Sequence, residues 1–477
     1  MSNNKQLQFV KGSAILILSN MIIKGINFLL LPLYTKYLTP ELLGVSDTIT
    51  TLTSMVFPLL VMGLDGGFSA FYFDERTEAY QKKVFNTVWF TLLIAGIVPV
   101  LLACLSKPIS VLMFGSPDYV FLVGIAMISV SMNLWYLPFS IYVRMENRMT
   151  AFAIINFIAS LSMILLNVVF LSVLEIGVYA LISSTAAINL IQLILYLRLG
   201  RILPQKSFYD KKLIRPMLKY SLPLVPNVVA VWILTMSDRY IILHFCGEWD
   251  VGLYGIATRC ATVISFIANG VYMAYTTYAY DKKDDADAPK QYSRILNAFN
   301  FAILLVCFTG SIFGKEIVLL MTEDAYSGAY LMVAPLLYSQ LLYGINTIVG
   351  YAIGFVKKSK YILLATSFGA VANVILNILL IPQFSVVAAA YTTLISFFLM
   401  TAMTYVISQK LYHVEYSTVK VIFSIAITFV VVMVTQEIGF AVKLAIWATV
   451  CISFALFNKN VVADYLRLAK KLLKRGA

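Results

Sequence analysis

Fourteen segments of about 20 or more predominantly apolar residues follow one another along the chain, and they constrain the fold more than any other feature. A helix needs about 20 such residues to cross a hydrocarbon core roughly 30 Å thick. The segments lie at 12–34, 47–73, 84–105, 119–143, 151–172, 176–198, 220–245, 251–280, 295–314, 326–355, 361–381, 386–408, 418–436 and 438–457. Charged residues make up 12% of the chain, where a soluble domain has about 25%. The sequence therefore predicts an all-α polytopic membrane protein with 14 transmembrane helices.

Basic residues alternate between the two sides of the predicted bundle. The termini and even-numbered connections hold 29 of the 36 Lys and Arg residues, and the opposite side holds only Lys36, Lys107, Lys315 and Lys443. By the positive-inside rule both termini face the cytoplasm. The net charge of +13 is thus mainly a topology signal, and we expect no nucleic-acid partner. We expect a multi-pass protein of the bacterial inner (cytoplasmic) membrane whose first apolar segment is a retained helix.

Several kinds of chemistry lack the residues that they need. The five cysteines form no CxxC pair, and no GxxxxGK[ST] motif for nucleotide binding is present. The two histidines, His244 and His413, fall at opposite faces of the predicted bundle and cannot share a site. The connections are too short to hold a glycosyltransferase domain. We therefore expect a protein that is not an enzyme and has no cofactor or resident metal.

The chain also contains a weak internal repeat. "LLGVSDTITTLTSMVFPL" (42–59) aligns with "DVGLYGIATRCATVISFI" (250–267), which places Gly44 against Gly252. "MILLNVVFL" (163–171) aligns with "NVILNILLI" (373–381), which places Asn167 against Asn377. Two parallel six-helix repeats follow from this order, and in transporters of this build the substrate lies between the repeats.

The repeat also predicts the domain organisation. We expect an N-lobe at 1–198 (helices 1–6), a cytoplasmic inter-lobe loop at 199–219, a C-lobe at 220–410 (helices 7–12), two appended helices at 411–458 and a basic cytoplasmic tail at 459–477. The two lobes would surround a central cavity.

A few ionisable residues fall inside the predicted spans: Lys24, Asp65, Asp238, Arg239 and Arg259. A charge at the centre of a membrane helix costs about 2.5–3.5 kcal/mol on insertion scales, so such residues face a wet cavity or one another. Asn20, Lys24 and Asn27 form one polar stripe at helical spacing. Three cations against two anions predict a basic cavity that suits a phosphate-bearing cargo, with arginine as a bidentate donor.

An alternative use of the same charges remains open. Asp238 with Arg259, and Lys24 with Asp65, would also serve as ion pairs that only hold the helices together. The residues expected in the substrate cavity are Lys24, Arg259, Arg239, Asn20, Asn27 and Asp65.

Three motifs and the helix plan resemble a known family. "LPLYTKYLTPELLGV" after the first helix, "SDRYIILHF" in the seventh and "GLYGIATR" at the start of the eighth resemble the polysaccharide-biosynthesis (O-antigen type) flippases. These belong to the multidrug/oligosaccharidyl-lipid/polysaccharide (MOP) exporter superfamily. The resemblance implies a MATE-like fold whose cavity admits the sugar–pyrophosphate head of a polyprenyl-linked oligosaccharide, for O-antigen, lipopolysaccharide or capsule synthesis.

The resemblance also implies roles for individual residues. Similarity to lipid II flippases implies that Lys24 and Arg259 contact the pyrophosphate. It also implies an ion site on helices 7, 11 and 12, at Asp238, Asn373, Asn377 and Thr393, for sodium or proton coupling. Expected partners are the lipid-linked oligosaccharide, membrane lipids and the glycan polymerase or assembly machinery, with the protein itself a monomer. A drug/cation antiporter of the same superfamily and a lipid II-type flippase remain alternatives.

Overall fold

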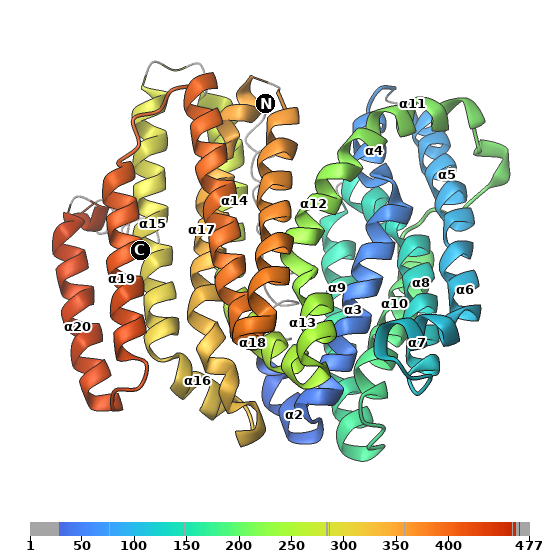
Figure 1. Ribbon diagram of the computed structural model, residues 1–477. Coiled ribbons are helices and arrows are strands. Elements are labelled where there is room, and N and C mark those ends of the chain that lie inside the picture. The colour runs from blue at the N-terminus through green and yellow to red at the C-terminus, as the bar shows by residue number, and fades with distance from the viewer. Residues whose placement is uncertain are drawn as a thin grey trace, which may run out of the picture. The chain divides into compact units, whose positions relative to one another are not determined.

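The computed structural model (Figure 1) describes residues 28–75, 77–146, 148–282, 285, 287–356, 358–459, 461–463 and 467. Every regular element within these ranges is a helix. Eleven stretches of the described residues are long and apolar enough to cross a membrane. The predicted all-α, multi-spanning fold is therefore confirmed.

The eleven stretches account for twelve of the fourteen predicted spans, because one stretch carries two of them. Helix α18 (Lys360–Leu411) contains 52 residues and carries two predicted spans, joined at Ser385, whose φ of 61° and ψ of −165° break the helix. An unbroken helix of that length would measure about 78 Å, more than twice the hydrocarbon core. The predicted span at 251–280 lies in α14 (Glu248–Lys282). Most of the first predicted span, 12–34, lies outside the described residues.

The chain forms two compact units, residues 1–252 and residues 253–477. In unit 1 the helices are α2 (Leu31–Tyr37), α3 (Pro40–Val61), α4 (Leu64–Phe71), α5 (Glu78–Ala95), α6 (Ile97–Cys104), α7 (Ser106–Phe114), α8 (Val120–Met145), α9 (Met149–Val168), α10 (Tyr179–Leu199), α11 (Lys211–Ser221), α12 (Val225–Met236) and α13 (Asp238–Cys246). The predicted inter-lobe loop belongs to this unit because α11 packs on α4 and α5. The seventh predicted span belongs to it as well, because α12 and α13 pack on α3. The lobe boundaries at 198/199 and 219/220 stay predictions.

Unit 2 contains the rest of α14 together with the C-terminal helices. These are α15 (Ala288–Ile312), α16 (Gly314–Met321), α17 (Tyr330–Phe355), α18, α19 (Thr418–Thr435) and α20 (Phe440–Phe457). Helix α17 packs on α15 and α18, while α19 and α20 both pack on α15.

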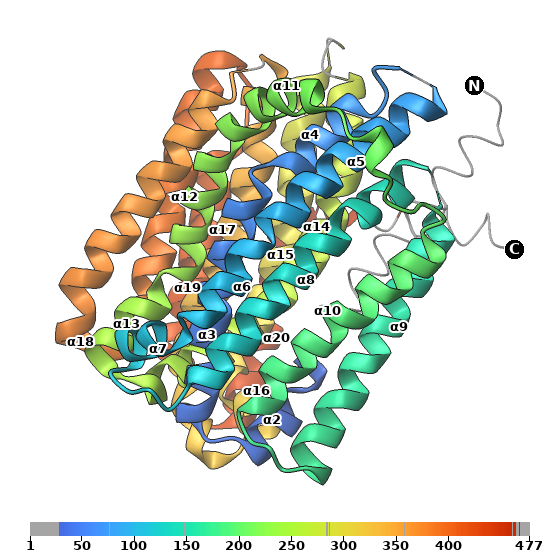
Figure 2. The ribbon, with the colours of Figure 1, turned by 90° about the vertical axis from the view of Figure 1, so that its right-hand side faces the viewer.

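Helix α11 shows how unit 1 is closed at one end (Figure 2). Its apolar side chains Leu213, Ile214 and Leu218 pack against the buried aromatic core of α4, α5 and α8. Its basic side chains, Lys211, Lys212, Arg215 and Lys219, are exposed. The amphipathic pattern of this helix is therefore satisfied by the protein's own core.

The two glycines that the internal repeat aligns make a close helix contact in unit 1. A Cβ atom on Gly44 of α3 would lie 1.8 Å from the carbonyl oxygen of Glu248, at the start of α14. A Cβ atom on Gly252 would lie 1.9 Å from the carbonyl oxygen of Pro40. Pro40 and Glu248 are separated by the same number of residues as Gly44 and Gly252, so the contact is symmetric under the repeat. Only glycine permits this approach.

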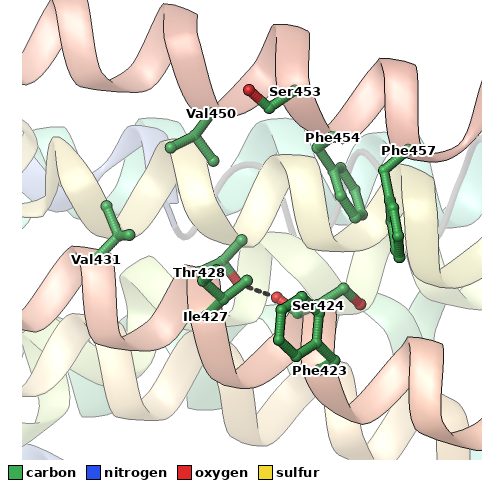
Figure 3. A pocket seen from close by; sticks show the side chains of 9 residues that line it. All are labelled: Phe423, Ser424, Ile427, Thr428, Val431, Val450, Ser453, Phe454 and Phe457. Carbon is green, nitrogen blue, oxygen red and sulfur yellow. Dashed lines mark hydrogen bonds between the residues drawn. The ribbon is translucent and has the colours of Figure 1, made fainter.

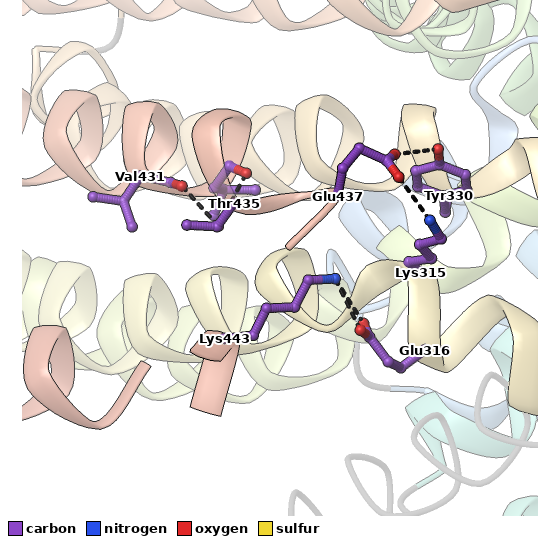
Figure 4. Close-up of polar contacts among 8 residues, drawn as sticks. Lys315, Glu316, Tyr330, Val431, Thr435, Glu437 and Lys443 are labelled. Carbon is purple, nitrogen blue, oxygen red and sulfur yellow. Dashed lines mark hydrogen bonds and ion pairs between the residues drawn. The ribbon is translucent and has the colours of Figure 1, made fainter. Parts of the chain in front are cut away.

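In unit 2 two ion pairs fasten the hairpin of α19 and α20 to α16 (Figure 4). The Lys443 ammonium lies 2.8 Å from a carboxylate oxygen of Glu316, and the lysine side chain is 1% exposed. The Lys315 ammonium lies 2.7 Å from a carboxylate oxygen of Glu437, which also accepts a hydrogen bond from Tyr330. Both residues of this second pair are solvent-accessible.

The difference in burial predicts different effects on stability. We expect Glu316→Gln to lower the free energy of unfolding by about 1–3 kcal/mol, because it leaves the buried Lys443 charge unpaired. That range is discounted from a fully buried pair, since Glu316 is 31% exposed. Glu437→Gln is the matched control, and we expect little change because exposed ion pairs contribute little. Heating the purified variants and measuring the remaining folded fraction by size exclusion tests this, and equal losses would contradict it.

Candidate functional site

The predicted cavity residues fall in three places. Asn20, Lys24 and Asn27 lie outside the described residues. Asp65 and Arg239 lie in unit 1, and Arg259 lies in unit 2.

Asp65 is placed by a break in the second predicted span. Met62 and Gly63 have φ values of 54° and 68°, which end α3 and start α4 in a new direction. Gly63 is required here, because a Cβ atom would lie 2.7 Å from the carbonyl oxygen of Ser221. Asp65 follows in the first turn of α4, where a negative charge is favoured by the helix dipole. Its side chain is exposed, so it is available to solvent or to a ligand.

Arg144 is a second cation in the same part of unit 1, and sequence reasoning missed it. It lies in the last turn of α8, where its Nε donates a hydrogen bond to the carbonyl oxygen of Ser140 at 3.3 Å. The guanidinium lies 5.6 Å from the ring centroid of Phe152, and the charge of Asp65 acts on it. The segment "RMENR" reads as a cytoplasmic connection. Only the length of α8, which runs to Met145, would have placed this arginine within a span.

Amide and hydroxyl side chains connect α8, α9 and α10 inside unit 1. Asn189 Nδ2 donates to Ser129 Oγ at 2.8 Å, and Gln192 Nε2 donates to Asn156 Oδ1 at 3.4 Å. The parallel rings of Tyr136 and Tyr196 stack with centroids 5.8 Å apart. Together with Arg144 these groups make the interior of unit 1 more polar than its apolar spans suggest.

Asp238 and Arg239, the two adjacent charges of the seventh predicted span, are both buried in unit 1. Asp238 is 0% exposed and Arg239 7% exposed. The span is interrupted at Ser237, so Asp238 occupies the first turn of the separate helix α13. One guanidinium nitrogen of Arg239 contacts Met236 Sδ at 3.5 Å. Burial at a helix start is consistent with the expectation that neither charge faces lipid.

Three of the four residues of the expected ion site come together in unit 2. Asn377 Nδ2 donates to Asn373 Oδ1 at 3.1 Å, and Asn373 Nδ2 donates to Thr393 Oγ1 at 3.4 Å. The hydroxyl of Tyr254 lies 3.4 Å from the same threonine oxygen. All four side chains are buried. The fourth expected residue, Asp238, belongs to unit 1.

The chemistry of this cluster is that of a neutral oxygen site. Amide and hydroxyl oxygens are ligands that hard cations accept, but here each oxygen already takes part in a hydrogen bond. Thr392 Oγ1 donates to Asn377 Oδ1, which completes the network. A cation would need these bonds to rearrange and a carboxylate to join. No cluster of three or more His, Cys, Asp or Glu residues suitable for a metal occurs in the described part of the chain.

The repeat is visible in these hydrogen bonds as well. In unit 1 the Ser184 hydroxyl donates to Asn167 Oδ1 at 3.3 Å. In unit 2 the Thr392 hydroxyl donates to Asn377 Oδ1. Asn167 and Asn377 are the pair that the sequence repeat aligns. The same asparagine–hydroxyl contact therefore joins equivalent helices in both units.

Arg259 lies in the fourth turn of α14. It is half-buried, and its carbonyl oxygen accepts a hydrogen bond from Thr262 at 2.7 Å. The neighbouring residue Cys260 is buried.

Sequence reasoning also missed an apolar groove between α19 and α20 (Figure 3). Its cavity volume is about 360 Å³, and it is lined by Phe423, Ser424, Ile427, Thr428, Val431, Val450, Ser453, Phe454 and Phe457. The hydroxyls of Ser424 and Thr428 are engaged within the protein: Ser424 accepts from Asn300 at 3.2 Å, and Thr428 donates to the carbonyl oxygen of Ser424 at 2.8 Å. The groove therefore offers an apolar surface with few free polar groups.

Sequence comparison connects the chain to two families. The family described as "Polysaccharide biosynthesis protein" matches residues 9–276, and the family described as "MatE" matches residues 223–379. An uncharacterized membrane protein of Methanocaldococcus jannaschii, MJ1068, is 21% identical over 291 residues, which cover 57% of each chain. A second protein of that organism, MJ1375, is 25% identical over 185 residues, 38% of this chain and 42% of its own. The chain thus spans little more than half the length of the first of these relatives.

Comparison with solved structures shows that the fold is similar to that of known transporters. A lipid II flippase, MurJ, in an inward closed conformation superposes with a TM-score of 0.74 at 14% identity, covering 95% of this chain and 100% of its own. A multidrug resistance MATE family transporter of the MOP superfamily, in an inward-facing conformation, superposes with a TM-score of 0.69 at 13% identity, covering 82% of this chain and 94% of its own. The fold is therefore similar to the folds of these two transporters. Because the family described as "Polysaccharide biosynthesis protein" matches more than half of the chain, this protein belongs to that family.

Proposed function

We propose that the protein is a flippase that moves a polyprenyl-(pyro)phosphate-linked oligosaccharide from the cytoplasmic to the outer leaflet for surface polysaccharide synthesis. The observation that carries the proposal is the apolar groove between α19 and α20. A lipid-linked sugar must keep its isoprenoid tail in an apolar environment while its polar head crosses the membrane. The groove supplies such an environment on the two helices that follow the twelve of the repeats.

The cationic residues support an anionic head group. Arg144, Arg239 and Arg259 lie within helices that are expected to span the membrane. Guanidinium groups bind phosphate oxygens in bidentate geometry, which suits a pyrophosphate. Lys24 would add a fourth cation from the first predicted helix.

The energy source is part of the proposal. With no nucleotide-binding motif in the sequence, outward movement of a dianion is favoured by an inside-negative potential, at about 2.3 kcal/mol per charge per 100 mV. We include sodium or proton coupling through Asp238, Asn373, Asn377 and Thr393, whose role would be to reset the empty carrier. Comparing transport rates in sodium and choline media at fixed pH tests whether transport is coupled to sodium. An unchanged rate would exclude sodium coupling.

Two alternatives share the fold. A drug/cation antiporter is one alternative, because the chain matches the MatE family and is structurally similar to a MATE transporter. A lipid II-type flippase is the other, because the chain is structurally similar to MurJ. The arginines favour an anionic cargo over a cationic one. Lipid II and oligosaccharide carriers share the pyrophosphate and differ only in the sugar.

The test is a flipping assay with purified protein in liposomes. A fluorescent oligosaccharide linked to undecaprenyl pyrophosphate is placed in both leaflets, and the fraction that a membrane-impermeant reagent reaches is followed over time. We expect faster exchange with the protein than in empty liposomes, and competition by the same lipid without its label. Exchange of a fluorescent organic cation but not of the glycolipid would favour the antiporter instead.

The groove makes a prediction of its own. Ser453 lines it and is exposed, so Ser453→Trp fills it without disturbing the core. We expect this variant to slow flipping of a 55-carbon carrier by about tenfold, the effect of losing roughly 1.4 kcal/mol of binding. A 10-carbon carrier should be affected little. Leu456→Trp, on the same helix but outside the groove, is the matched control, and equal behaviour of both variants would contradict the role of the groove.

We further propose that the α11 end of unit 1 faces the cytoplasm. The basic side chains of this helix, and the excess of Lys and Arg in its connections, follow the positive-inside rule. A single cysteine at position 206 should resist a membrane-impermeant thiol reagent in intact cells, whereas one at position 118 should react. The opposite pattern would invert the topology.

A further inference from the structure

The basic side chains of α11 form one continuous stripe. At 3.6 residues per turn, four exposed cations fall within an arc of about 100° around the helix axis: Lys211, Lys212, Arg215 and Lys219. Three of them follow one another at intervals of four residues, about 6 Å apart along the axis. We call these four residues the basic stripe. The positive-inside rule accounts for the number of cations at this end of the unit, but not for their alignment on one face.

The opposite face of α11 is buried in unit 1. Leu213, Ile214 and Leu218 pack against the aromatic core, and Met217 belongs to that core and is 0% exposed. In Figure 2 the helix lies across the end of the unit, over α4 and α5, and it is in contact with both. The basic stripe therefore faces away from the helical bundle, toward water and not toward acyl chains.

The segment that leads into α11 is fastened to α5. Two buried side chains of α5 accept hydrogen bonds from its backbone: Asn86 Oδ1 from the N–H of Gln205 at 2.6 Å, and Thr87 Oγ1 from the N–H of Asp210 at 3.1 Å. The Asp210 carboxylate then caps α11 by accepting from the N–H of Lys212 at 2.9 Å. The stripe thus begins at a fixed position, and a binding partner would not have to order it.

The basic stripe is not neutralised by the protein itself. In the described part of the chain none of its four side chains forms an ion pair or a side-chain hydrogen bond, whereas Lys82 of the neighbouring α5 pairs with Glu78 at 2.7 Å. Like charges four residues apart destabilise a helix. Lys211 and Lys212 also lie in the first turn, where the helix dipole disfavours cations. The arrangement costs stability, and an acidic partner would recover it.

We propose that the basic stripe is a docking surface for an acidic helix of a partner protein. Carboxylates at four-residue intervals on that helix would lie opposite Lys211, Arg215 and Lys219, since both helices have the same rise per residue. Arg215, at the centre, would bind its carboxylate in bidentate geometry. Lipid headgroups fit less well, because a helix that lies in the membrane interface inserts its apolar face, and here that face is buried in the protein. The partner would be cytoplasmic if unit 1 has the proposed orientation.

Binding of a helical peptide to the protein in zwitterionic lipid nanodiscs tests the proposal. Both faces of the protein are accessible in a nanodisc, so the result does not depend on orientation or on transport. The probe is a fluorescein-labelled, alanine-rich helix with a glutamate at every fourth position, and the control peptide carries the same residues with its glutamates distributed around the helix. We expect the probe to bind about fivefold or more tightly than the control, with an affinity that falls as salt is added. Equal binding of the two peptides would contradict the spacing argument.

The triple variant Lys211→Gln, Arg215→Gln and Lys219→Gln should reduce the affinity for the probe to that for the control peptide. All three positions are exposed, so the variant should fold normally, which size exclusion checks. Full affinity of this variant would place the peptide elsewhere and overturn the proposal.

A matched triple variant removes the same charge from exposed positions of unit 2: Lys290→Gln, Lys358→Gln and Lys410→Gln. We expect its affinity to stay within about twofold of normal, because exposed charges outside the contact contribute little. If both triple variants weaken binding equally, the peptide responds only to general surface charge and the proposal is wrong. The last arm uses nanodiscs that contain phosphatidylglycerol. We expect the unmodified protein still to bind the probe more tightly than the α11 triple variant does, and loss of that difference would assign the stripe to anionic headgroups instead.

Discussion

Replacing either Gly44 or Gly252 with alanine is expected to lower the free energy of unfolding by about 3 kcal/mol or more. The added methyl group would lie less than 2 Å from a backbone carbonyl oxygen in each case. Overpacking of a well-packed core costs about 1–3 kcal/mol when side chains yield. Backbone atoms cannot rotate away, so α3 and the start of α14 must separate. Because the two positions are equivalent under the repeat, both variants should be affected to a similar extent.

Gly124→Ala is the matched control for this prediction. Gly124 also lies inside a helix, but its nearest obstacle is Ser106 Oγ at 3.8 Å, an ordinary contact. Alanine is the better helix former by about 0.5–1 kcal/mol, so this variant should be neutral or slightly more stable. Thermal unfolding of the three purified variants, followed by size exclusion in one detergent, measures the difference. Normal stability of Gly44→Ala would mean that the close contact is absent from the protein in solution.

The same glycines show how far sequence reasoning reaches. Hydrophobic length predicted the helical spans, because each span must independently cross the same hydrocarbon core. The repeat aligned Gly44 with Gly252 and Asn167 with Asn377, and each pair has equivalent contacts in the structure. Equivalent residues share an environment when the helices around them are arranged alike. A weak sequence repeat can therefore predict particular contacts.

Features that depend on how the side chains of different helices pack together could not be predicted from the sequence. The sequence places Arg144 in a connection, because nothing local shows that α8 continues to Met145. The groove between α19 and α20 arises where the side chains of separate helices fail to fill the space between them. The spacing of apolar residues along a helix does not predict where such unfilled spaces will occur. The expected Asn373, Asn377 and Thr393 cluster did form, since its members lie on the two helical halves of one hairpin-like element.

Arg259→Ala is expected to have the largest effect on transport. If the guanidinium binds the pyrophosphate in bidentate fashion, its removal costs two charge-assisted hydrogen bonds, each worth about 1.5–3 kcal/mol. Flipping of the lipid-linked oligosaccharide in liposomes should then fall by about 100-fold or more. Arg294→Ala, which removes an exposed arginine from α15 of the same unit, is the matched control and should flip at the normal rate.

Arg259→Lys separates the charge from the geometry. Lysine keeps the positive charge but offers a single ammonium in place of a planar pair of donors. We expect it to restore part of the rate, about a tenth of normal, with a higher KM for the carrier. Full recovery would mean that only charge matters at this position. If Arg259→Ala flips the carrier at the normal rate, the arginine does not bind the head group. If the variant fails to insert into the membrane or aggregates after purification, the role of Arg259 is to hold the helices together.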